Sequence, residues 1–261
     1  MNEKKIRIIK NGPYVVTGNV DLSEKIIRPE EDKSKDAKYV WEDGGEIAHE
    51  EAYALCRCGA SKKHPFCDGS HSETGFDGTE TASKKPYRER SELIKGRNVD
   101  LLDDGRCAGA RFCYREKGDA WYLASCDDNS EKIICEAVKS ASECPAGRLT
   151  ALAKDGSCIE PELGPSIDIT QDPENDVSGG IYVKGGIPLV SADGSEYEIR
   201  NRIVLCRCGK SKNKPFCDGT HAKVRFNGTE TAGDEPYLEN PTVIRGPELE
   251  LDDYERLCAH A

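Results

Sequence analysis

The chain has 261 residues, 36% of them hydrophobic and 33% charged, and its formal net charge is −11. This balance is typical of a folded protein of two or three small domains. The sequence contains no run of about 18 apolar residues, the length needed to span a membrane. Neutralising phosphates requires clusters of Lys and Arg, which acidic residues offset in this chain, so we expect neither nucleic acid nor a membrane as partner.

The chain opens with a strand-like segment, residues 6–9, and nothing near it resembles the apolar core of a signal peptide. There are thirteen cysteines, an odd number, while aromatic residues are few at 7%. We predict a cytoplasmic protein, because closely spaced cysteines in a reducing compartment bind metal more often than they form disulfides. Bound metal would also stabilise small domains with modest cores.

An internal repeat determines the predicted domain organisation. Residues 56–87 align without a gap with residues 206–237 and are identical at 20 of 32 positions. Upstream, residues 12–20 resemble 180–187, two short strand signals around a Gly turn, but at an offset of 168 rather than 150. The additional residues of the first copy fit the polar stretch 28–36, which we predict to be an exposed loop. The predicted modules are residues 1–97, 98–163 and 164–261.

The first copy has four candidate metal ligands. Cys56 and Cys58 are two residues apart and would share one face of a strand, and the loop after them would let Cys67 approach. Cys67 and His71 are four residues apart, so one helical turn would stack their side chains, and Asp68 could cap the exposed amides of that turn. Three thiolates and one imidazole suit a tetrahedral metal or the two irons of a small cluster.

The central segment has cysteines of its own. Cys107 and Cys113 come first, and Cys144 follows a stretch with a helical pattern, residues 131–143. The proline after Cys144 ends this helix and fixes the thiolate at a turn. The segment also contains Cys126, Cys135 and Cys158.

The second copy repeats the ligand pattern with the same spacing, at Cys206, Cys208, Cys217 and His221. Near the end of the chain, Cys258 falls close to the repeat equivalent of Cys107. We interpret Cys258 as a remnant of the duplication and Cys158 as a bystander.

Both ligand sets resemble the CDGSH iron-sulfur family, the mitoNEET-like proteins. The family pattern is Cys-x-Cys, two residues, Ser or Thr, three residues, then Pro-x-Cys-Asp-Gly-Ser/Ala/Thr-His, and both copies fit it in full. The resemblance implies a 2Fe-2S cluster in each copy, with one iron on Cys56 and Cys58 and the other on Cys67 and His71. By the same carry-over, the second cluster is bound by Cys206, Cys208, Cys217 and His221.

A structural zinc site with the same ligands is the alternative, since three cysteines and one histidine commonly bind zinc. Zinc ligands usually come as two Cys-x₂₋₄-Cys pairs, which is not the spacing in this chain, so we favour iron. The imidazole is the ligand that a proton can displace near neutral pH, and we expect it to be the labile one. A neutral ligand in place of a thiolate should also raise the reduction potential.

The central segment resembles divergent single-cluster bacterial ferredoxins. These bind 3Fe-4S, or 4Fe-4S when a central cysteine is present, through Cys-x₅-Cys and a remote Cys-Pro. The matching residues are Cys107, Cys113 and Cys144, whereas Ala110 occupies the central position. The resemblance implies a third cluster, for which Cys126 or Cys135 could still supply a fourth ligand.

These inferences predict an α+β protein in which two β-rich CDGSH modules, related by pseudo-two-fold symmetry, flank a ferredoxin-like insert. Its expected function is electron transfer with a redox protein. The alternative is cluster transfer to an apo-iron-sulfur acceptor, or redox or pH sensing, through the labile His-ligated clusters. Small members of the family form two-fold dimers, so we expect this tandem to be a monomer whose N-terminal hairpin pairs with the other copy. The sequence has no nucleotide-binding Gly motif and no nucleophile–base arrangement, so an enzyme is not expected.

Overall fold

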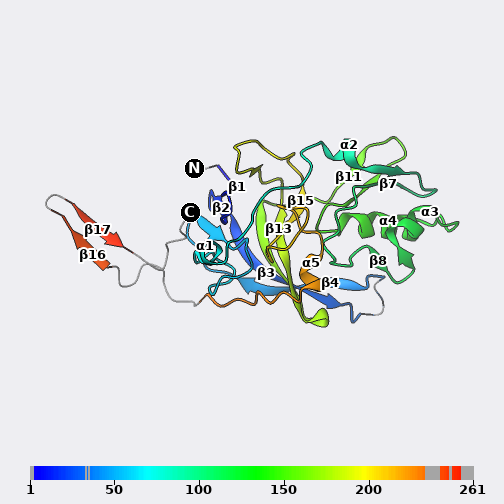
Figure 1. Cartoon of the computed structure of the whole chain (residues 1–261). Helices are drawn as coiled ribbons and strands as arrows, with labels where there is room; N and C mark the ends of the chain where they lie inside the picture. The colour runs from blue at the N-terminus through cyan, green and yellow to red at the C-terminus, as the bar shows by residue number, and fades with distance from the viewer. Residues whose placement is uncertain (1–2, 33, 35, 233–241, 247–248, 254–261) are drawn as a thin grey trace.

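The structure is a computed structural model, and it describes residues 3–32, 34, 36–232, 242–246 and 249–253. Cys258 lies outside the described residues. In chain order (Figure 1) the elements are β1 (Lys5–Ile8), β2 (Tyr14–Thr17), β3 (Asp21–Pro29), β4 (Tyr39–Glu46), β5 (Tyr53–Leu55), α1 (Ser70–Glu73), α2 (Tyr87–Arg90), β6 (Glu92–Ile94), β7 (Asp100–Asp103), β8 (Tyr114–Arg115), β9 (Gly118–Asp119), α3 (Ala120–Ser125), α4 (Glu131–Ser142), β10 (Leu149–Leu152), β11 (Cys158–Ile159), β12 (Ser166–Asp172), the 3₁₀ turn η1 (Pro173–Asn175), β13 (Val177–Lys184), β14 (Leu189–Val190), β15 (Arg202–Leu205), α5 (Thr220–Lys223), β16 (Thr242–Arg245) and β17 (Glu250–Asp253).

Two sheets form the body of the molecule, and each contains strands from both copies. The first sheet has the strand order β14-β1-β2-β5, and the second has the order β15-β13-β12-β3-β4. β1 pairs in parallel with β14, where Ile6 lies opposite Leu189, and β3 pairs in parallel with β12, where Leu22 lies opposite Ile167. The predicted pairing of the N-terminal hairpin with the other copy is therefore confirmed.

The alternating apolar residues of these strands meet in one shared core. Tyr14 and Val16 of β2 are fully buried in it, together with Ile167 and Ile169 of β12. Alternation places every second side chain of a strand on the same face. Because that face is covered by strands of the other copy, neither copy has a complete core by itself.

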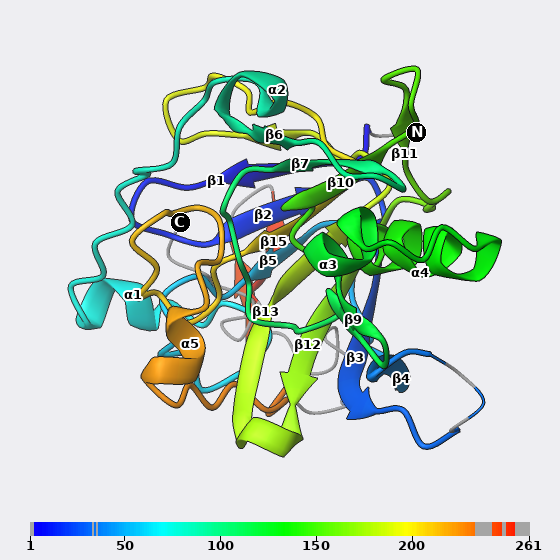
Figure 2. The same cartoon turned by 90° about the vertical axis from the view of Figure 1, so that its right-hand side faces the viewer.

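The central segment has its own sheet and core. Its strand order is β11-β10-β7-β6, and Figure 2 shows α3 and α4 beside β10. α4 matches the predicted helix to within one residue and buries Ile133, Ala137 and Ala141 at helical spacing. The chain is thus α+β and rich in strands, as predicted. β6 already belongs to this sheet, which therefore begins before the predicted boundary at residue 98.

The polar stretch that was predicted to be an exposed loop is a loop only in part. The polar stretch 28–36 forms the end of β3 and part of the connection to β4, and its described residues 31, 32 and 34 are exposed. Among the described helices, none combines the length and the apolar character that crossing a bilayer requires.

A buried arginine joins the central segment to the C-terminal copy. Arg202, the first residue of β15, is 1% exposed, and all five of its N–H groups donate hydrogen bonds. Nε and Nη2 each bind the Glu160 carboxylate at 3.0 Å, and Nη2 also donates to the carbonyl of Leu149 at 3.1 Å. Nη1 donates to the carbonyls of Ala141 and Cys144. Arg202 therefore fixes the loop that carries Cys144.

A second ion pair fastens the same segment at another point. Arg111 binds Asp172 through two parallel contacts, Nη1 to Oδ2 at 2.6 Å and Nη2 to Oδ1 at 3.0 Å. Although burial opposes it, the hydrogen bond from Arg111 lowers the pKa of Asp172. The hydrogen bonds that Arg202 makes to the central segment have no equivalent in the first copy, because the residue at the repeat position there is Ala52.

Replacing Arg202 by leucine is expected to lower the free energy of unfolding by about 3–5 kcal/mol, because a carboxylate and three carbonyl groups would lose their donor inside the protein. Chemical denaturation followed by circular dichroism measures the change. Arg7→Leu on the exposed side of β1 is the control and should change the free energy by less than about 0.5 kcal/mol. Equal effects of the two substitutions would contradict the role given to Arg202.

Candidate metal centres

The four predicted ligands of the first copy form two close pairs. The Sγ atoms of Cys56 and Cys58 lie 3.8 Å apart, directly after β5. The Sγ atom of Cys67 lies 3.3 Å from Nδ1 of His71, which belongs to α1. The first pair and His71 are buried, and Cys67 is half-buried.

The second copy builds the same arrangement. The Sγ atoms of Cys206 and Cys208 are 3.9 Å apart, and the Sγ atom of Cys217 is 3.3 Å from Nδ1 of His221 in α5. All four of these side chains are buried. The structure therefore groups all eight predicted ligands as four pairs in two sites.

The separations fit one metal atom per pair. With a metal–sulfur bond of about 2.3 Å and a metal–nitrogen bond of about 2.0 Å, tetrahedral angles put two sulfurs about 3.8 Å apart and a sulfur and a nitrogen about 3.5 Å apart. Within the described ranges, no group of three or more His, Cys, Asp or Glu side chains is arranged to hold a single ion. Since each pair has the spacing of two ligands on one metal, the four donors of a site suit a group with two metal atoms.

The ligand loop is held by an aspartate. Asp68 accepts hydrogen bonds from the backbone amides of Lys62 at 2.8 Å and Ser70 at 3.0 Å. Although burial opposes it, these hydrogen bonds lower the pKa of Asp68. Ser70 is the first residue of α1 and Gly69 is its N-cap, so Asp68 accepts from the first helical amide but stands one position before the cap. The equivalent contacts in the second copy join Asp218 to Lys212 and Thr220.

The local geometry differs from the predicted single helical turn. α1 begins at Ser70, so His71 is helical while Cys67 precedes the helix. Gly69 lies between them with φ at 87°, a left-handed conformation that favours glycine. This turn, rather than stacking along one helix, brings the Cys67 thiol to the imidazole. Gly219, with φ at 79°, does the same in the second copy.

The ligand side chains differ in acidity. A hydrogen bond from Cys58 lowers the pKa of Cys56, and donating that hydrogen bond raises the pKa of Cys58. Burial raises the pKa of Cys67 to about 11 and that of Cys217 to about 12. Burial also lowers the pKa of His221. Metal binding at neutral pH must therefore displace protons from buried thiols.

The two ligand loops contact each other directly. A Cβ atom added to Gly59 would lie 2.7 Å from the carbonyl oxygen of Cys208, and one added to Gly209 would lie 2.3 Å from the carbonyl oxygen of Cys58. Both glycines have positive φ, 77° and 72°. Any side chain at either position would therefore push the two sites apart.

Each loop is also bound by the segment that follows the ligands of the other copy. The amides of Thr81 and Ala82 donate to the carbonyl of Lys214 at 2.8 and 2.9 Å. Reciprocally, the amides of Thr231 and Ala232 donate to the carbonyl of His64 at 2.9 and 3.0 Å. These pairs are repeat equivalents, so the same contact is made twice in opposite directions.

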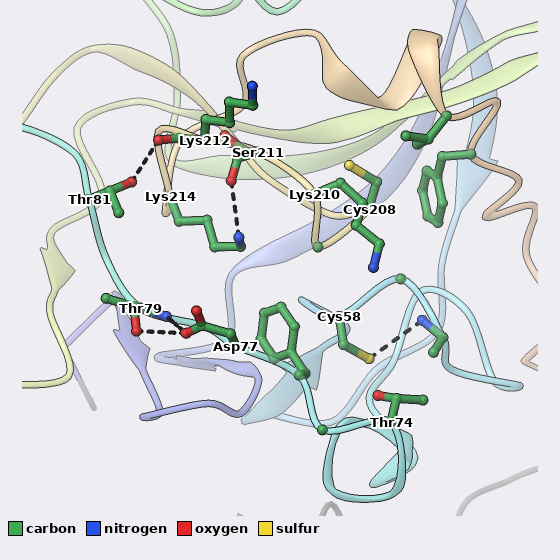
Figure 3. A pocket seen from close by; sticks show the side chains of 17 residues that line it. Cys58, Thr74, Asp77, Thr79, Thr81, Cys208, Lys210, Ser211, Lys212 and Lys214 are labelled. Carbon is green, nitrogen blue, oxygen red and sulfur yellow. Dashed lines mark hydrogen bonds between the residues drawn. The ribbon is translucent and has the colours of Figure 1, made fainter.

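A cavity of about 950 Å³ lies between the two sites, and Figure 3 shows Cys58 and Cys208 on facing sides of it. Three lysines line the part of its wall that belongs to the second copy: Lys210, Lys212 and Lys214. Lys210 and Lys212 are exposed. One buried ligand from each site thus lines the same cavity, in whose wall the three lysines outnumber the single acidic residue, Asp77.

Two buried arginines were not among the predicted site residues. Arg57 and Arg207 stand between the cysteines of their Cys-Arg-Cys segments, and each is 1% exposed. Arg57 donates to the carbonyls of Ile9 and Gly78. Arg207 has no hydrogen-bond partner in the described part of the chain, and burial lowers its pKa to about 10. Arg207 interacts electrostatically with Cys56, a ligand of the first site. The presence of an arginine at this position in both copies was the sequence signal for such a role.

Three central cysteines lie near one another and near the second site. Burial and, to a smaller extent, the neighbouring Cys144 and Cys107 together raise the pKa of Cys113 to about 12. Cys107 in turn acts on the pKa of Cys217. A Cβ atom added to Gly219 would lie 3.4 Å from the Cys107 carbonyl oxygen. These influences place the three predicted ligands of the central segment in one neighbourhood beside the second copy, with Cys107 exposed.

The other central cysteines have different surroundings. The Sγ atom of Cys126 lies 3.7 and 3.5 Å from the carbonyl oxygens of Leu123 and Asp128. Cys135 is exposed on α4, and Cys158 is exposed on β11. None of these contacts favours Cys126 or Cys135 as a fourth ligand.

Comparison with known protein families gives one match. A family model described as iron-binding zinc finger of the CDGSH type matches residues 11–72 and 178–222. The two matched ranges include all eight paired ligands and flank the central segment. No curated protein and no solved structure was found to match the chain.

Metal loading of the metal-free protein is expected to strengthen as the pH rises, because the Cys67 and Cys217 thiols, with pKa values of about 11 and 12, must release their protons on binding. Each released proton should raise the apparent affinity about tenfold per pH unit below its pKa. Cobalt(II) titrations at several pH values, read from the visible absorption, measure the slope. Cys67→Ser should reduce the slope, whereas an affinity independent of pH would contradict the expectation.

Proposed function

Since the chain carries two CDGSH-type iron-binding domains, one on each side of a central segment, we propose that it is an electron carrier with a 2Fe-2S cluster in each domain. CDGSH domains bind such clusters, and iron-sulfur binding follows from the family match. We assign one iron of the first cluster to Cys56 and Cys58 and the other to Cys67 and His71. The observation that carries this assignment is the spacing within each pair, which suits two ligands of one metal. The second cluster is assigned to Cys206, Cys208, Cys217 and His221.

The two domains are proposed to be related by a pseudo-two-fold axis that passes between the ligand loops. The reciprocal hydrogen bonds of Thr81 with Lys214 and of Thr231 with His64 support this relation. So does the mutual approach of Gly59 and Gly209. An interface in which each contact occurs twice is what a symmetric dimer makes, and here one chain supplies both halves. We therefore propose a monomer.

A bound 2Fe-2S cluster supplies one-electron redox chemistry. The residues of the chain determine how much charge accompanies that electron. Each site provides three thiolates and one neutral imidazole, and the buried guanidinium of Arg207 interacts with Cys56 of the first site, where it offsets part of the negative charge. Less negative charge favours the reduced state, and a histidine ligand acts in the same direction. We therefore propose potentials above those of ferredoxins with four cysteine ligands.

The central cysteines are proposed to hold a third cluster, 3Fe-4S, on Cys107, Cys113 and Cys144. Cys144 and Cys107 both act on the pKa of Cys113, which supports a common site. Ala110 leaves the central ligand position without a thiol. Because Cys107 lies beside Cys217, electrons would pass between the third cluster and the second CDGSH site.

The partner is proposed to be a redox protein with an acidic surface. The chain as a whole has a net charge of −11, yet Lys210, Lys212 and Lys214 gather at the cavity between the sites. An acidic partner docked at this opening would approach Cys58 and Cys208 together, so both clusters would be within its reach (Figure 3).

Cluster transfer to an apo-iron-sulfur acceptor is a second candidate. It is favoured by a cavity of about 480 Å³ that has His71 in its wall. The two functions differ in what leaves the protein, an electron or the cluster itself.

Anaerobically purified protein is expected to contain roughly seven irons, four from two 2Fe-2S clusters and three from 3Fe-4S. The triple variant with serine at Cys107, Cys113 and Cys144 should retain about four irons, whereas Cys126→Ser should change nothing. Iron and sulfide analysis with paramagnetic resonance measures this. Four irons in the unaltered protein would show that it binds no third cluster. Zinc without sulfide would refute the proposed function.

Replacing His71 or His221 by cysteine is expected to lower the potential of the altered cluster by on the order of 100 mV or more, because a thiolate adds negative charge. The pH dependence of that potential should also weaken, since the protonatable ligand is gone. Redox titrations followed by paramagnetic resonance at several pH values test both effects. An unchanged potential in both variants would mean that neither histidine is a ligand.

A further inference from the structure

The two sites have the same ligands but different surroundings, and we propose that the first site alone exchanges its cluster with an incoming thiol. This inference rests on the proposed 2Fe-2S sites and assigns them separate tasks. The first site would be the exchange site, entered through the cavity beside His71. The second would be closed and would serve electron transfer with the central cysteines.

A cavity lies beside the histidine of the first site. The cavity of about 480 Å³ is lined by Ile9, Lys10, Asn11, His71, Ser72 and Phe76, together with Gly75 and Asp77. Lys10 and Ser72 are exposed at its rim. Cys67, the partner ligand of His71, is itself half-buried.

The second site is covered by the central segment. Cys217 is 4% exposed and packs with Ala108, Ala146 and Tyr182. The imidazoles are similarly buried, 7% for His71 and 6% for His221. Access therefore differs through what lies next to the ligand pair rather than through exposure of the ring.

The cover exists in one copy only because of side chains that the other copy lacks. Arg202 holds the carbonyls of Ala141, Cys144 and Leu149, the segment from which Ala146 reaches the second site. Its repeat equivalent is Ala52, which has no group to hold such a segment. The duplication therefore produced two equal ligand sets, and the inserted segment made their accessibility unequal.

The exchange step is a ligand substitution without electron transfer. A thiol that enters the cavity would form an iron–sulfur bond as the bond between iron and the His71 nitrogen breaks. The proton of the thiol would pass to that nitrogen. Each of the three cysteine–iron bonds would then break as a further thiol binds, with the proton of that thiol passing to the leaving cysteine sulfur, so charge and atoms balance. A free small thiol and a cysteine of an acceptor protein share this chemistry, and both are tested below.

The test follows cluster loss from the anaerobic holo-protein after adding excess dithiothreitol, or an apo-ferredoxin, as the thiol donor. Visible absorption should fall in two phases. Quenching with iodoacetamide and mass spectrometry should find Cys67 alkylated during the fast phase and Cys217 only in the slow phase. A fast phase with dithiothreitol means that a small thiol suffices, and one with the apo-ferredoxin alone assigns the site to a protein cysteine. Equal alkylation rates for Cys67 and Cys217 with both donors would overturn the inference.

A matched pair of substitutions tests the route. Ser72→Trp would fill the cavity beside His71 and should slow the fast phase several-fold, whereas Ala222→Trp, at the repeat-equivalent exposed position, should leave both phases unchanged. Equal slowing by the two substitutions would overturn the route. The alkylation experiment uses the unaltered chain and stays decisive if a tryptophan variant fails to fold. A protein that binds no iron-sulfur cluster would refute the proposed function instead, and iron analysis before the experiment distinguishes that case.

Discussion

The arrangement of this protein depends on one buried guanidinium. Arg202 uses its five N–H groups on one carboxylate and three backbone carbonyls, all of which belong to the central segment. Burying a charge costs less free energy when every donor is hydrogen-bonded, and the carbonyls that Arg202 satisfies would in turn be left without a donor if it were removed. Because β15 leads from Arg202 directly to Cys206, the same residue links the central segment to the second ligand loop. The position of the central segment and the position of the second ligand loop therefore both depend on Arg202.

The first ligand loop is supported in a different way, by the other copy. The N-terminal hairpin reaches the second copy not only through β1 and β14 but also through Tyr14, whose hydroxyl donates to the carbonyls of Cys206 and Pro215 at 3.0 Å each. Burial raises the pKa of this tyrosine far above its ordinary value, so it remains a donor. Strands, loops and ligands of the two copies are thus mutually dependent, and metal binding in one domain should stabilise the other.

The inserted segment explains how a duplicated site can acquire two tasks. Two equal ligand sets in a symmetric dimer would have equal surroundings, and nothing would distinguish them. Here the segment with Cys107, Cys113 and Cys144 lies against the second site only. The same packing brings the central cysteines close to the second site and covers the ligands of that site. Such an asymmetry supports cluster exchange at the first site and electron transfer at the second.

The sequence by itself determined the parts of this protein that depend on local spacing. Both ligand sets follow from a motif of sixteen positions whose turn residues, such as Gly69, fix the chain between the donors. The helix that ends before Cys144 follows from its apolar period and the proline after the cysteine. Pairing of the N-terminal hairpin with the other copy followed from the tandem repeat. What the tertiary structure decided are contacts between residues far apart in the chain. No local pattern distinguishes Arg202 from any other arginine, because burial and long-range hydrogen bonding are set by the packed core. For the same reason, only the fold separates an open first site from a covered second one.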